Sequence, residues 1–180
     1  MPICATTAQL WKTELADRGS SLLRRYESWK DDITAEFEIE KDVFTGFYAV
    51  RKLMDSGLLN NISNSLCEPI KYPAVSGVDF DAKFEERWTR AYDFMRGKSE
   101  SLPIREACNQ LIHSKIYSPF VVDSLGVMGI YFSSDRKYKS CAYYLQFFKV
   151  AEMFLSASED RKVELEMHIK GTQFSFIRLS

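Results

Sequence analysis

The spacing of apolar residues changes near residue 115, and this change limits the possible folds more than any other feature of the sequence. Before that point, apolar side chains recur at steps of three, four and seven, the period of an amphipathic helix. After it, β-branched and aromatic runs alternate with turn-forming residues, as in an antiparallel sheet. The sequence therefore predicts an α+β fold, helical over residues 6–115 and β-rich over residues 116–180.

The helical part predicts an up-down bundle of four helices. The first spans residues 6–30, with a weak point at Gly19, and the second spans residues 34–56, with Gly57 as its C-terminal cap. The second helix is the most apolar and is expected to form the centre of the core. Its apolar residues are Phe37, Val43, Phe44, Phe47, Val50 and Met54.

Two further helices are predicted after a stretch of turn formers at residues 60–77, which can hold only short ordered pieces. The third helix begins at Asp79 or Asp81 and continues to residue 96, because apolar side chains again repeat at helical spacing. The fourth starts near Ser101, with Pro103 in its first turn, and ends near His113.

The β-rich part begins with three apolar runs, at residues 120–122, 127–132 and 140–145, which predict an antiparallel meander. One short helix is expected over residues 146–157. The strictly alternating residues 163–169 and the run 172–177 then predict a β-hairpin.

Composition fits one globular domain over residues 1–180, with 46% hydrophobic and 27% charged residues. Lys and Arg total 24 against 25 for Asp and Glu, so net charge gives no overall attraction to nucleic acid. The four cysteines are scattered without metal-ligand spacing, which predicts reduced thiols and no metal or other cofactor. No secretory signal or apolar membrane run is found, so a cytoplasmic protein with no membrane partner is expected.

Histidine is the scarcest acid–base residue, with only two copies. His168 lies in an alternating run beside Glu166 and is interpreted as a solvent-side or edge-strand residue. Arg105, Asn109 and His113 follow one another at steps of four, so they share one face of the fourth helix. Two interpretations stay open: a functional strip, or a histidine that favours the negative end of the helix dipole beside solvent-exposed neighbours.

The stretch Ala107-Cys-Asn-Gln-Leu-Ile-His-Ser114 resembles the Arg-Asn-x-x-x-His motif of HEPN superfamily domains, which are up-down helical bundles. The resemblance covers at most residues 6–115. Residues 40–56, 108–113 and 129–135 are also similar to uncharacterised bacterial proteins. In active members of the superfamily, the resemblance implies that Arg and His, paired across a homodimer, handle the RNA 2′-hydroxyl and the scissile phosphate without metal.

This chain departs from the motif at Cys108, which occupies the arginine position. A thiol cannot supply the positive charge that stabilises a developing phosphorane. Arg105 lies about one turn away and is the candidate substitute. Cys108 itself is expected to be a small core residue, because five helical residues place it roughly 140° from His113, too far round for a nucleophile–base pair.

A second candidate site is the basic turn at residues 136–139, which contains Arg136, Lys137, Tyr138 and Lys139. Its cations can contact phosphates while the aromatic ring stacks on a base. A turn that is simply solvated has the same composition.

Three hypotheses follow. The first is a HEPN-like interaction or nucleic-acid-associated module without robust catalysis, in a bacterial defence or toxin–antitoxin setting. The second is a metal-independent endoribonuclease using His113, Asn109 and Arg105. The third is a structural or multimerising protein that pairs through a strand edge at residues 172–177. The partners implied are RNA and a second copy of the chain.

Overall fold

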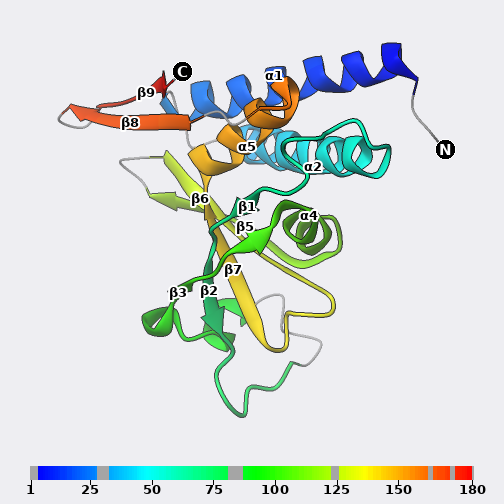
Figure 1. Cartoon of the computed structure of the whole chain (residues 1–180). Coiled ribbons are helices and arrows are strands. Elements are labelled where there is room, and N and C mark those ends of the chain that lie inside the picture. The colour runs from blue at the N-terminus through cyan, green and yellow to red at the C-terminus, as the bar shows by residue number, and fades with distance from the viewer. Residues whose placement is uncertain are drawn as a thin grey trace.

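Two long helices running in opposite directions begin the fold of the computed structural model (Figure 1). The structure describes residues 4–27, 33–80, 87–122, 126–161, 164–170 and 173–179. Helix α1 spans Ala5–Glu27 and α2 spans Ile33–Asp55, which confirms the first two predicted helices.

The predicted weak point at Gly19 does not break α1, which is continuous through it. A Cβ atom at this position would lie 2.9 Å from Leu155 Cγ and 3.2 Å from the carbonyl oxygen of Ala151. Both contacts belong to helix α5 (Phe147–Glu159). Gly19 therefore allows two helices from opposite ends of the sequence to approach closely.

The main core lies between α1, α2, α5 and the sheet. From α2 it contains Ile39, Val43, Phe47, Val50 and Leu53, and Phe47 meets Phe154 edge to face at a centroid distance of 5.4 Å. Each such side chain contributes about 1.5–3 kcal/mol when it leaves water. The central place of α2 is confirmed, except that Phe37 is 62% exposed and does not belong to the core.

The largest sheet has the strand order β3-β2-β7-β6-β5. Strands β5 (Ser114–Val122), β6 (Gly126–Ser134) and β7 (Cys141–Gln146) form the predicted antiparallel meander. Strand β2 (Ile70–Pro73) pairs with β7 and with β3 (Lys98–Ser99). The stretch predicted to hold only short ordered pieces thus supplies an inner strand of four residues. A separate pair joins β1 (Leu66–Cys67) to β4 (Leu102–Pro103).

The third predicted helix is wrong over residues 88–96, and residues 81–86 of it lie outside the described part. Two short 3₁₀ turns, η1 (Trp88–Ala91) and η2 (Phe94–Arg96), occupy this stretch, and Tyr92 between them bridges to Ala74. Trp88, one of the residues that suggested a helix, instead packs on the sheet, with its ring centre 5.4 Å from that of Tyr131. Phe94 packs on the same ring at 5.5 Å. Packing on the aromatic surface of the sheet outweighs local helical propensity here.

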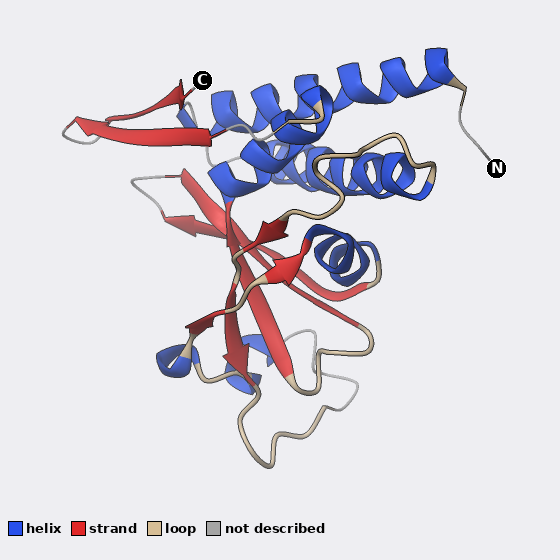
Figure 2. Ribbon diagram, in the orientation of Figure 1, coloured by secondary structure: helices blue, strands red, loops and turns tan. Residues whose placement is uncertain are grey.

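The fourth predicted helix is present as α4 (Ile104–Ile112), which packs between α2 and the sheet. The predicted short helix is α5, and the hairpin is formed by β8 (Glu164–Lys170) and β9 (Gln173–Leu179). The architecture is a mixed α+β one (Figure 2). The predicted bundle drew all its helices from residues 6–115, and this was wrong in one respect. The helix that packs on α1 together with α2 is α5, which comes from the part predicted to be β-rich.

Hydrogen bonds to the residue that follows α5 hold the loop after α2 in place. Asp160 adopts a left-handed conformation with φ 52°, and its carboxylate accepts hydrogen bonds from the main-chain N–H groups of Asn60 and Asn61 at 3.0 and 3.1 Å. Among the described residues, no helix is both long and apolar enough to cross a membrane.

Candidate functional site

Helix α4 presents one face to the core. Ala107, Cys108 and Leu111 on this face are fully buried. Burial raises the pKa of the Cys108 thiol to about 12, so the thiol is protonated at neutral pH. The expectation that Cys108 is a core residue is confirmed.

A second face of α4 meets the C-terminal end of α2 through a charged cluster. The Asp55 carboxylate accepts hydrogen bonds from Arg51, at 2.8 Å, and from Arg105, and Arg51 also donates to the Asn109 side-chain oxygen. Partial burial raises the pKa of Asp55, but the hydrogen bonds from the two guanidinium groups outweigh it and the pKa is lowered. The Arg105 guanidinium is therefore engaged with a carboxylate.

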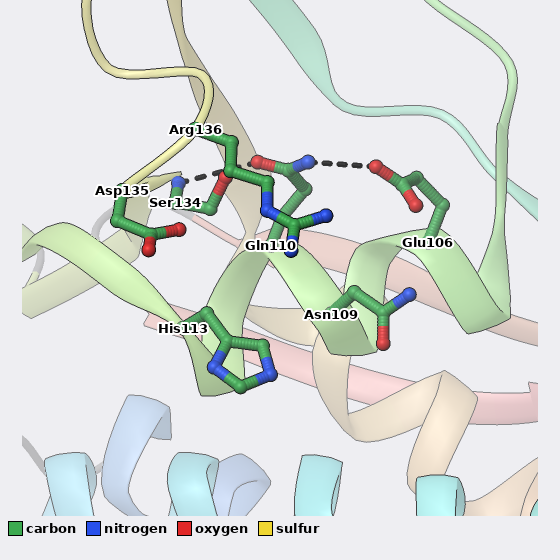
Figure 3. Close-up of a pocket in the computed structure, with 7 residues that line it drawn as sticks. All are labelled: Glu106, Asn109, Gln110, His113, Ser134, Asp135 and Arg136. Carbon is green, nitrogen blue, oxygen red and sulfur yellow. Dashed lines mark hydrogen bonds between the residues drawn. The ribbon is translucent and has the colours of Figure 1, made fainter.

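The third face of α4 borders a polar hollow of about 250 Å³, which we call the α4 hollow. Helix α4 and the residue that caps its C-terminus contribute four of the lining residues, and the end of β6 with the following turn contributes three (Figure 3). The lining residues are Glu106, Asn109, Gln110, His113, Ser134, Asp135 and Arg136. Of the predicted site residues, His113, Asn109 and Arg136 are brought together here, and Arg105 is not.

Strand pairing explains why α4 meets the basic turn. Strand β5 starts directly after His113, and its first residue, Ser114, is paired with Ser134 at the end of β6. The main-chain N–H of Asp135 donates to the His113 carbonyl at 3.0 Å. His113 thus caps α4 beside the turn, and its side chain is exposed at the rim of the hollow.

Gln110 holds the wall of the hollow in place. Its side-chain N–H donates to Glu106 Oε1 at 2.7 Å, and its side-chain oxygen accepts from the Ser134 N–H at 3.2 Å (Figure 3). Gln110 and Ser134 are both buried. Gln110, Ser134, Glu106 and Asp135 were not predicted as site residues. The sequence gives no sign of their proximity, because the pairing of β5 with β6 brings α4 next to the turn.

The hydroxyl group of Ser134 lacks a hydrogen-bond partner among the described residues. Ser134 is only 4% exposed, so its Oγ atom is also cut off from bulk water. The neighbouring Ser133 is different, because its hydroxyl donates to the Cys141 carbonyl at 2.8 Å. Buried hydroxyl groups nearly always have a partner, so the Ser134 hydroxyl is an exception within the wall of the hollow.

The basic turn is divided between two environments. Arg136 lines the α4 hollow, and Lys139 is exposed. Tyr138 is half-buried, and its ring packs edge to face on Phe80 at a centroid distance of 5.5 Å. Its carbonyl oxygen accepts a hydrogen bond from the Tyr92 hydroxyl. The structure therefore uses Tyr138 in packing, rather than as an open stacking surface.

The remaining predicted features lie away from the hollow. His168 is exposed on β8, in a two-stranded sheet, with Nε2 3.5 Å from Glu166 Oε2, which confirms its interpretation as a solvent-side residue. Within the part of the chain that the structure describes, no group of three or more His, Cys, Asp or Glu side chains is placed to hold a metal ion.

Comparison with known proteins gives no identification. The chain matches no protein-family model, no curated protein and no solved structure.

Proposed function

We propose that the chain is a HEPN-like, nucleic-acid-associated module that binds single-stranded RNA at the α4 hollow and the basic turn, without robust catalysis. One observation carries the proposal: His113 and Arg136, from two separately predicted sites, line the same hollow. An exposed imidazole beside a guanidinium, with Lys139 exposed on the same turn, suits a single strand whose bases are accessible.

The charges around the hollow argue against an efficient nuclease. Metal-independent cleavage needs a fixed cation where negative charge develops on the phosphate. Cys108 is buried and Arg105 is hydrogen bonded to Asp55, so neither supplies that cation. Glu106 and Asp135 also line the hollow, and their negative charges would oppose a phosphorane.

A metal-independent endoribonuclease remains the second candidate, and the position of Arg136 favours it. In that case Arg136 replaces Arg105 as the stabilising cation, His113 is the acid–base group and Asn109 positions the substrate. The HEPN resemblance further implies a homodimer, which light scattering on the same samples would measure.

Binding of fluorescently labelled single-stranded RNA, followed by anisotropy, tests the proposal. We expect His113→Ala and Arg136→Ala each to weaken binding about tenfold, while Arg105→Ala and His168→Ala leave it unchanged. Equal binding by all four variants, or no binding by the wild type, would refute the proposal.

Incubation of the same RNA with and without EDTA separates the two candidates. The module should leave the RNA intact under both conditions. Multiple-turnover cleavage that resists EDTA and is lost in His113→Ala would establish the ribonuclease instead.

A further inference from the structure

The α4 hollow is small, and its charges select against a phosphate group. Its volume of about 250 Å³ lies below the roughly 300–1,000 Å³ of pockets for drug-sized ligands, so it suits a fragment such as one planar base. Figure 3 shows Arg136 extending from the turn over α4, with the carboxylates of Asp135 and Glu106 on opposite sides of it in this view. The hollow is lined by two carboxylates and one guanidinium, and this combination favours an uncharged ligand that carries hydrogen-bond donors.

Guanine is the base that matches this combination of groups. Its N1–H and exocyclic N2–H groups can donate together to one carboxylate, and its O6 and N7 atoms can accept from one guanidinium. Adenine has no N1–H, and the pyrimidines have no N7. Asp135 and Arg136 are adjacent in the chain and both line the hollow, so they can contact these two edges together.

Two exposed side chains near these groups also suit a base in an RNA strand. The His113 ring at the rim offers a flat surface for stacking, as aromatic rings do in single-strand recognition. The exposed Lys139 lies outside the hollow, where it can contact the backbone phosphates.

We propose that the α4 hollow binds one unstacked guanine of a single-stranded RNA, with Asp135 reading N1–H and N2–H and Arg136 reading O6 and N7. This inference rests on the proposed RNA-binding function and assigns its sequence preference.

Short oligouridylates with one central guanosine, adenosine, inosine or 7-deazaguanosine test the inference by anisotropy. We expect the guanosine strand to bind about tenfold more tightly than the adenosine strand, the lower end of the range for a good bidentate contact. Inosine lacks the N2 amino group and 7-deazaguanosine lacks N7, so each should bind several-fold more weakly than guanosine.

Variants then assign each contact to a residue. Asp135→Asn should abolish the difference between guanosine and inosine, and Arg136→Lys the difference between guanosine and 7-deazaguanosine. The matched control is Glu166→Gln, which removes an exposed carboxylate on β8 and should leave every preference intact. Thermal melts establish that each variant is folded.

Three outcomes would overturn the inference. Equal binding of all strands, reduced in Lys139→Gln, would refute guanine recognition while preserving RNA binding. Absence of binding to any strand would refute both proposals. Guanosine monophosphate binding as tightly as the guanosine strand would identify a free nucleotide, rather than RNA, as the ligand.

Discussion

Helix α4 has two polar sides, and they differ in how completely their groups are satisfied. On the side facing α2, Arg51 and Arg105 share Asp55, and Asn109 accepts a hydrogen bond from Arg51. On the side facing the basic turn, a hollow remains and, among the described residues, the Ser134 hydroxyl has no partner. The first side connects two helices, whereas the second borders the hollow, where Asp135 and Arg136 are exposed.

The largest expected effect is that of placing an arginine at Cys108, on the buried face between these two sides. Cys108→Arg would place a charge at a fully buried position, and an unpaired buried charge costs several kcal/mol. We expect a loss of more than about 3 kcal/mol in unfolding free energy, or failure to fold, measured by urea denaturation. The control Cys108→Ala should cost only about 1–2 kcal/mol. A stable Cys108→Arg variant that cleaves RNA would contradict our description of this face.

Gln110 should matter more for stability than Asn109, although they are neighbours. Gln110→Ala would leave the buried Ser134 N–H without its acceptor, at a cost of about 1–3 kcal/mol. Asn109→Ala removes a contact between half-buried groups and should cost less than about 1 kcal/mol. Urea denaturation of both variants measures the difference, and equal losses would show that Gln110 does not hold the wall of the hollow.

Arg105 should contribute to stability and not to RNA binding, whereas Arg136 should contribute to RNA binding and hardly to stability. Arg105→Gln removes a half-exposed ion pair and should lower stability by up to about 1 kcal/mol without changing RNA affinity. Arg136→Gln should leave stability within about 0.5 kcal/mol and lower RNA affinity about tenfold. Thermal melts and anisotropy on both variants give the four values. If Arg105→Gln also weakens RNA binding, the functional surface extends to the side of α4 facing α2.

The smallest expected effect is a pH dependence at Asp55. Its pKa is lowered in the folded state, so the stabilisation is present above the unfolded value of about 3.9 and is lost as the pH falls through the lower folded value. Because Asp55 is 46% exposed, we expect only a few tenths of a kcal/mol. Urea denaturation from pH 7 to pH 3 should show that the wild type has a higher free energy of unfolding than Asp55→Asn at neutral pH. This difference should disappear at the acidic end. A constant difference would indicate that the ion pairs do not stabilise the fold.

Local sequence patterns were sufficient to predict an element when its signal lies in neighbouring residues. The apolar stripe of α2, the alternation in β8 and the Asp–Arg–Lys turn after β6 all lie within short windows, and they were predicted correctly. Strand β2 was missed because its residues are surrounded by turn formers, and only pairing with the distant β7 makes them extended. The helix expected over residues 88–96 failed for the related reason that Trp88 and Phe94 pack on Tyr131.

The site was predicted in two halves whose connection the sequence does not reveal. His113 and Arg136 were each named as candidates, but the pairing of Ser114 with Ser134 determines that they line one hollow. Arg105 was chosen by helical spacing, which cannot account for Asp55 on another helix. Ser134 carried no local signal, because its distinguishing property is an unsatisfied hydroxyl in the folded chain.

The close approach of α1 and α5 at Gly19 also bears on how the protein is made. During synthesis α1 leaves the ribosome before α5, which packs against it and is translated more than a hundred residues later. Until then, the stripe of α1 that contains Leu15 and Leu22 lacks this cover, and contacts of such long sequence separation slow folding. C-terminal truncations that remove α5 should therefore expose this stripe and aggregate rather than yield a smaller folded protein.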